Sequence, residues 1–168
     1  AMVGALNGVS GATAIGYNAL TALTSGAGNT AVGYQSLDAE DDGSFNTAVG
    51  YQALTAQTGT SGAVSNTAVG YQAGVAITKG QYNTIVGSVA LSAEDVGNST
   101  TAIGYQAFVS QNSDSDNEET GNTGVGRNVG YYNVTGQNNT YMGTNAGLGA
   151  SGQSNSNNTA VGASALTA

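Results

Sequence analysis

The sequence predicts an all-β fold, a parallel β-solenoid or β-roll of about ten short coils with a 17-residue base period. Three observations support this prediction. A short unit recurs along the chain, Thr and Val recur two positions apart within it, and Gly, Asn, Ser and Thr make up 81 of the 168 residues. Because the array fills residues 1–168, we expect one repeat domain, a fragment of a longer fibre protein or a filament subunit.

Each unit is anchored by a glycine that follows Val, Ile or Met. The spacings between successive anchors are 12, 17, 17, 20, 17, 17, 22, 17 and 19 residues. A period of 17 is too short for helical-pair repeats or propeller blades, so the units are expected to stack as coils of strand. The ten anchors are Gly4, Gly16, Gly33, Gly50, Gly70, Gly87, Gly104, Gly126, Gly143 and Gly162.

The strand of each unit comes first, with Thr three residues and Val, Ile or Met one residue before the anchor. We expect the Val side chains to point into the coil, as at Val49, and the Thr side chains to form a buried or half-buried ladder that hydrogen-bonds along the stack. An ice-binding face would need two regular Thr columns, and the sequence has one, so the structural role is favoured. The clearest columns are Thr30, Thr47, Thr67 and Thr84, and Val32, Val49, Val69 and Val86.

The anchor glycine comes next and suits a bend or a close approach of two backbones. The central anchors are Gly33, Gly50, Gly70 and Gly87, and a small residue and then Leu or Phe follow three and four positions later. Tyrosine often follows the anchor directly, where it could pack between chains or bind sugars, and packing is favoured. These tyrosines are Tyr17, Tyr34, Tyr51, Tyr71 and Tyr105.

The variable loop completes each unit. Every 17-residue interval has a second glycine seven residues before its anchor, and the longer intervals lack it, so the extra residues lie between the Leu column and an Asn column. We interpret that Asn column as turn residues that tolerate a left-handed backbone and bond along the stack. Insertions belong in loops, so Gln57, in the lengthened turn before Asn66, is expected at the surface.

Composition excludes most chemistry. The chain has no His, Cys, Trp or Pro, and two basic residues against ten acidic ones give a net charge of −8. We therefore expect no enzyme activity, no cofactor, no nucleic-acid partner and no membrane insertion of this segment. Carboxylates gather in loops, and a glycosidase would need two of them oriented toward a cleft, which nothing in the sequence indicates.

One acidic loop is a weak calcium candidate. Asp114, Asp116 and Glu118 alternate as in a Ca²⁺ loop. The EF-hand pattern fails, because Glu119 stands where its glycine belongs and Val125 where its last glutamate belongs. A solvated insertion loop without metal is the favoured interpretation.

The repeated Thr-Ala-Val-Gly core resembles the head domains of trimeric autotransporter adhesins. The longer form, Asn46 to Leu54, also resembles repeats of phage tail-fibre proteins. This resemblance implies a left-handed β-roll, a homotrimer packed side by side, and exposure on a cell or virion. The expected function is a structural and adhesive extracellular fibre segment, with a cell-surface glycan or protein as receptor. The alternative is a self-polymerising filament subunit that stacks end to end through open coil edges.

Overall fold

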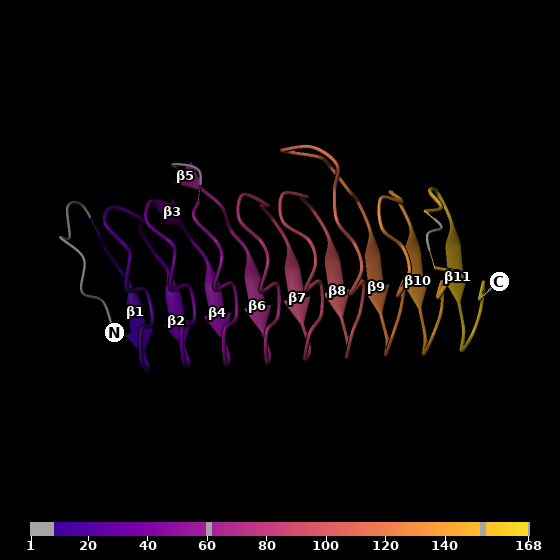
Figure 1. Ribbon diagram of the computed structural model, residues 1–168, viewed down its shortest axis with the longest axis horizontal. Coiled ribbons are helices and arrows are strands. Elements are labelled where there is room, and N and C mark those ends of the chain that lie inside the picture. The colour runs from indigo at the N-terminus through magenta and orange to yellow at the C-terminus, as the bar shows by residue number, and fades with distance from the viewer. Residues whose placement is uncertain (1–8, 60–61, 152–153, 168) are drawn as a thin grey trace.

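The computed structural model describes residues 9–59, 62–151 and 154–167 as a parallel β-solenoid of about nine turns. One three-residue strand per turn forms a nine-stranded sheet that runs the length of the molecule (Figure 1). Within the described ranges there is no helix, and hence none that could span a membrane. The nine strands are β1 (Thr13–Ile15), β2 (Thr30–Val32), β4 (Thr47–Val49), β6 (Thr67–Val69), β7 (Thr84–Val86), β8 (Thr101–Ile103), β9 (Thr123–Val125), β10 (Thr140–Met142) and β11 (Thr159–Val161).

The strand register confirms the predicted units. Each strand pairs in parallel with the strand of the next turn, and the column residues pair with one another, as Thr47 does with Thr67 and Val49 with Val69. Of the ten predicted units, the one anchored at Gly4 lies outside the described residues. The two-residue strands β3 (Gly43–Ser44) and β5 (Gly62–Ala63) form a second small sheet among the loops.

The buried residue of each strand is the middle one, so the prediction that Val points into the coil is wrong. Ala48 is fully buried, whereas Val49 is half-buried and Val69 is 37% exposed. Side chains two positions apart share one face of a strand, so Thr and Val point outward together. The interior accepts mostly alanine from the strand because Leu and other long side chains fill it from the opposite wall, as Leu54 does.

The core is one continuous cluster in which large and small residues compensate. Ile85 replaces alanine in β7, and Gly74 replaces leucine in the neighbouring turn; a Cβ atom at Gly74 would lie 2.7 Å from the Ile85 Cδ1. Tyr141 in β10 is likewise matched by Gly147. The Leu position has a left-handed backbone, with φ of 50° at Leu54, so glycine also relieves strain there.

The anchor glycines allow neighbouring coils to touch backbone to backbone, as predicted. Gly50 has a φ of 142°, and a Cβ atom there would clash with the carbonyl oxygen of Gly70. Gly33 lies in the same way against Gly50. Because this contact recurs from turn to turn, the glycine column sets how closely the coils stack.

The Asn column forms a ladder of hydrogen bonds inside the coil rather than at its surface. Asn66 donates its backbone N–H to the Asn46 Oδ1 at 3.0 Å, and its side-chain amide donates to the carbonyl of Gly80 at 2.6 Å. Its own Oδ1 accepts from the backbone N–H of Asn83 at 2.8 Å. Bonding along the stack was therefore predicted correctly, but the left-handed residue is the one before each Asn, such as Tyr82 with a φ of 59°.

The Thr column lies outward and half-buried or exposed, and it is not the hydrogen-bonded ladder that we predicted. Over the described ranges, no column threonine uses its hydroxyl in a side-chain hydrogen bond. The buried amides of the Asn column supply the polar ladder instead.

Candidate functional site

The strand face is uncharged along its whole described length. Its outward columns are Thr and Val, Ile or Met, and the second column includes exposed side chains at Ile15, Val86 and Met142. The face therefore lacks the second Thr column that an ice-binding surface would need. It offers instead a stripe of methyl groups at the spacing of the strands, about 4.8 Å.

The predicted tyrosine column is a stack of exposed rings. Adjacent ring centroids lie 5.0–5.4 Å apart with planes within 13° of parallel, in the order Tyr17, Tyr34, Tyr51 and Tyr71. Ser88 follows in the column, so Tyr105 lies apart from the stack. Beside the rings, the amide of Gln52 donates to Gln35 and that of Gln72 to Gln52.

This stacking limits what the tyrosines can bind. A sugar packs its C–H face against an open aromatic ring, but both faces of Tyr34 and Tyr51 are covered by neighbouring rings. The column therefore presents ring edges and hydroxyl groups. A stack of this kind suits lateral packing better than the stacking of a sugar ring.

The negative charge is confined to the variable part of the repeat. All ten carboxylates fall in segments 38–42, 94–95 and 114–119, and none lies in a strand of the described residues. The longest loops project beyond the row of strands on one side of the molecule, at residues 112–119 and around β5 (Figure 1). The strand face and the acidic loops are therefore separate surfaces.

The weak calcium candidate does not gather into a metal cage. Asp116 forms an ion pair with Lys79 at 2.6 Å, and Glu118 accepts from the backbone N–H of Asp114 at 3.1 Å. Within the described residues, the three carboxylates that do come within 4.8 Å of one another are those of Glu40, Asp41 and Asp42.

Glu40 is a buried carboxyl group that sequence reasoning missed. It accepts from the backbone N–H of Gly43 at 2.7 Å and from the Asn46 amide at 3.3 Å. Burial raises its pKa from 4.5 to about 7, the Gly43 hydrogen bond opposes the rise, and the charges of Asp41 and Asp42 add to it. Burial also raises the pKa of Asp42, with Asp41 contributing.

Gln57 is fully buried, so the prediction that it lies at the surface is wrong. Its amide bridges two rungs of the Asn ladder, donating to the Asn46 Oδ1 at 3.4 Å and accepting from the Asn66 amide at 3.0 Å. The insertion begins after Gln57, and the lengthened unit lacks the glycine whose carbonyl accepts from an Asn amide in the shorter units, so the Asn46 amide donates to Glu40 instead. Glu40 and Gln57 each stand seven residues after their anchor glycine.

That position is a further inward column whose residue type changes from coil to coil. It is buried in seven successive coils, which carry Leu23, Glu40, Gln57, Ile77, Glu94, Gln111 and Asn133. The order apolar, Glu, Gln occurs twice, so the first six coils form two three-coil blocks 54 residues apart at this position. Comparing units three coils apart would have found it in the sequence.

The second block repeats the polar cluster of the first with more hydrogen bonds. Glu94 accepts from the backbone N–H of Gly97 at 2.8 Å, from the Gln111 amide at 3.0 Å and from the Ser113 hydroxyl at 3.1 Å. Gln111 in turn accepts from the Asn122 amide at 2.9 Å. The pairing of β3 with β5 also recurs, as a parallel bridge between Asn98 and Glu119.

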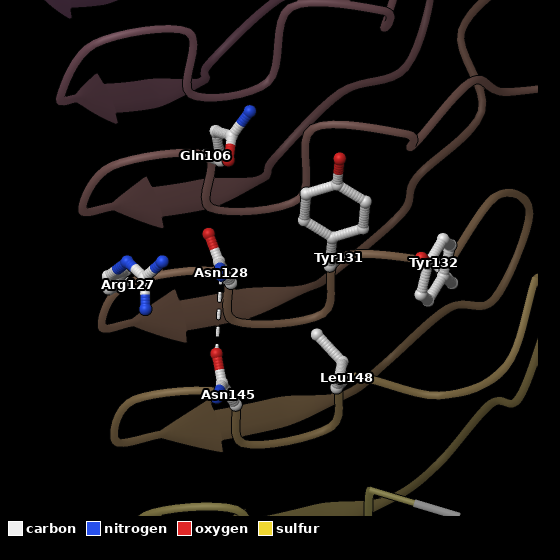
Figure 2. A pocket seen from close by; sticks show the side chains of 7 residues that line it. All are labelled: Gln106, Arg127, Asn128, Tyr131, Tyr132, Asn145 and Leu148. Carbon is white, nitrogen blue, oxygen red and sulfur yellow. Dashed lines mark hydrogen bonds between the residues drawn. The ribbon is translucent and has the colours of Figure 1, made fainter.

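A cleft of about 390 Å³ opens near the C-terminal end of the array, where the block pattern is lost. One wall is a column of amides from three successive turns, Gln106, Asn128 and Asn145. Figure 2 shows Tyr131 and Leu148 across from this column, Tyr132 on the side of Tyr131 away from the amides, and Arg127 beside Asn128. No carboxylate lines the cleft.

Two features of the cleft were not expected from the sequence. The Asn128 amide donates to the Asn145 Oδ1 at 3.3 Å, while the Asn128 Oδ1 is buried without a partner among the described residues. The rings of Tyr131 and Tyr132 meet edge to face, with centroids 4.8 Å apart. The departure of this coil from the consensus, with Arg127 in place of the common Tyr, is the signal that could have indicated a site.

Comparison of the chain with protein-family models, with curated proteins and with solved structures found no significant match.

Proposed function

We propose that this chain is a structural segment of an extracellular fibre, a stiff rod that associates with copies of itself and displays its loops on a cell surface or virion. The observation that carries the proposal is the unbroken parallel register of nine strands, each paired residue for residue with the next. The resemblance of the repeat to adhesin heads and tail-fibre repeats supports the same role.

The bonding between coils supports a mechanical function. Each strand junction is flanked by backbone hydrogen bonds, such as Thr47 N–H to the Asn66 carbonyl at 2.8 Å and Gly70 N–H to the Val49 carbonyl at 2.9 Å between β4 and β6. The buried Asn ladder runs parallel to these bonds. Bending the rod would stretch several hydrogen bonds at once, so the array resists bending more than a chain of separately folded units would.

Self-association is proposed to use the strand face, with a second copy of the chain as the partner. This face is uncharged, whereas the ten carboxylates lie elsewhere, so copies can meet there without bringing their negative charges together. Exposed Val86 and Met142 would lose their contact with water. Two copies also share one strand spacing, so their methyl columns can interdigitate along the full length of the rod.

Size measurement and electron microscopy test the proposal. Discrete trimers, seen as rods by negative staining, are expected, and Val86→Asp should weaken them strongly because it places charges in the interface. Ala63→Asp, on an exposed residue of the loop edge, is the matched control and should leave the assembly unchanged. A wild-type chain that is monomeric at high concentration would overturn the proposal. Filaments without a fixed length would favour the end-to-end alternative.

A further inference from the structure

The cleft beside Arg127 has the chemistry of a binding site for an anion. Arg127 is one of two basic residues in a chain of net charge −8, and the other, Lys79, is paired with Asp116. Among the described residues, the Arg127 guanidinium forms neither an ion pair nor a side-chain hydrogen bond. A planar guanidinium without a partner, at a cleft that no acidic side chain lines, is suited to bind a carboxylate through two parallel hydrogen bonds.

The amide wall adds groups that recognise hydroxyls. The Asn128 Oδ1 is a buried acceptor without a partner in the described part of the chain, and such a group is destabilising until a donor reaches it. Elsewhere, from Gln35 to Gln72, hydrogen bonds between side-chain amides connect successive turns of the column. Between Gln106 and Asn128 no such hydrogen bond connects the two turns. The Gln106 side-chain amide at this break lines the cleft and forms no side-chain hydrogen bond among the described residues, so it can bond to a ligand hydroxyl.

The opposite wall is apolar and available to a ring. In the tyrosine stack each inner ring is covered on both faces, whereas Tyr131 contacts Tyr132 edge to face and lies across the cleft from Asn128 (Figure 2). Leu148 continues the wall on the next turn. The C–H face of a pyranose packs on such a surface while its hydroxyl groups reach the amides.

We propose that this cleft binds an acidic saccharide, a pyranose that carries a carboxylate. Arg127 holds the carboxylate, Gln106 and its neighbouring amides hold ring hydroxyls, and Tyr131 with Leu148 packs against the apolar ring face. The volume of about 390 Å³ is within the range of small-molecule sites and suits one or two sugar units. This inference goes beyond the mechanical role and does not depend on the oligomeric state.

Calorimetric titration of the full chain tests the inference with two trisaccharides, acidic trigalacturonate and neutral maltotriose. Trigalacturonate is expected to bind saturably and more weakly as salt is added, whereas maltotriose is expected to bind at least about tenfold more weakly. Arg127→Gln should weaken trigalacturonate binding by about tenfold or more. Lys79→Gln removes the other cation, outside the cleft, and should change the affinity less than about twofold.

Two further measurements make the result decisive. Tyr131→Ser should weaken the acidic trisaccharide and leave acetate binding unchanged, because acetate needs Arg127 alone. Thermal melts of each variant confirm that it is folded. The proposal is overturned if trigalacturonate does not bind, if both trisaccharides bind equally, or if Lys79→Gln weakens binding as much as Arg127→Gln. Fibre assembly is measured separately, so its failure would leave this test intact.

Discussion

Replacing Glu40 with Gln should make the protein less sensitive to pH between about 4.5 and 7. Glu40 is buried, and its pKa rises from 4.5 to about 7 on folding. Below pH 4.5 the carboxyl is protonated in both states. Between the two values the folded state keeps the proton and the unfolded state releases it, so the free energy of unfolding falls as the pH rises. Above pH 7 the carboxylate is ionised in both states and its full burial penalty is present.

The magnitude follows from the size of this shift. Each pKa unit corresponds to about 1.4 kcal/mol, so a rise from 4.5 to about 7 corresponds to a loss of roughly 3 kcal/mol of stability. Gln keeps the length of the side chain and carries no charge. As the pH rises from about 4.5 to 7, the wild type should therefore lose roughly 3 kcal/mol of unfolding free energy relative to Glu40→Gln.

Urea unfolding at half-unit intervals from pH 4 to pH 8 measures the effect. Asp41→Asn is a matched control, because it removes a neighbouring charge and leaves the buried carboxyl in place. Burial is the larger cause of the shift, so this control should keep most of the pH dependence. If Glu40→Gln differs from the wild type by the same amount at every pH, the carboxyl is not titrating in this range and the reasoning is refuted.

Three further predictions concern the coil itself. In thermal melts, Gly50→Ala should destabilise the protein by several kcal/mol more than Gly62→Ala. Both positions have a positive φ, but only at Gly50 would the added methyl group meet the backbone of the next coil. Equal losses of stability would contradict the close contact. At concentrations where the chain is dissociated, Ala48→Asp places a carboxylate in the core and should lower the unfolding free energy by several kcal/mol, whereas Val49→Asp should lower it by about 1 kcal/mol or less, and the reverse order would restore the inward Val column. Removing divalent metal with a chelator should leave the melting temperature unchanged, and a large drop restored by Ca²⁺ would show that a bound metal stabilises the fold.

The repeat pattern predicted what depends on periodicity. Equal spacing implies equal conformation, so the parallel register, the close approach at Gly50 and the position of the insertions all follow from where identical residues recur. A period also shows that Thr47 and Val49 share a face. The period does not show which face of the strand is buried. Burial depends on how far across the coil Leu54 and Gln57 reach, and therefore on the width of the coil, which all its turns determine together.

The buried polar residues were harder to predict for a different reason. Glu40 and Gln57 occupy one column, but its residues differ in chemistry from coil to coil, so no recurring residue type marks it. The cleft beside Arg127 lies where the sequence of the coil departs from the consensus repeat, with Arg127 in place of the common Tyr. Such a departure has no periodicity by which it could be recognised. A side chain's burial in these places depends on partners in the neighbouring coils and not on its own sequence segment.

The glycine column has a consequence for how such a chain can change its length. Since each coil contacts the coils before and after it through the same backbone surfaces, removing or duplicating one whole coil leaves the backbone contacts of the remaining coils equivalent, although matched side-chain pairs such as Gly74 with Ile85 must be kept together. Gaining or losing a single residue within the strand and its bend would instead bring a side chain against the carbonyl that Gly50 now faces. The rod can therefore lengthen or shorten only in whole turns, about 4.8 Å at a time, and it measures distance in discrete steps.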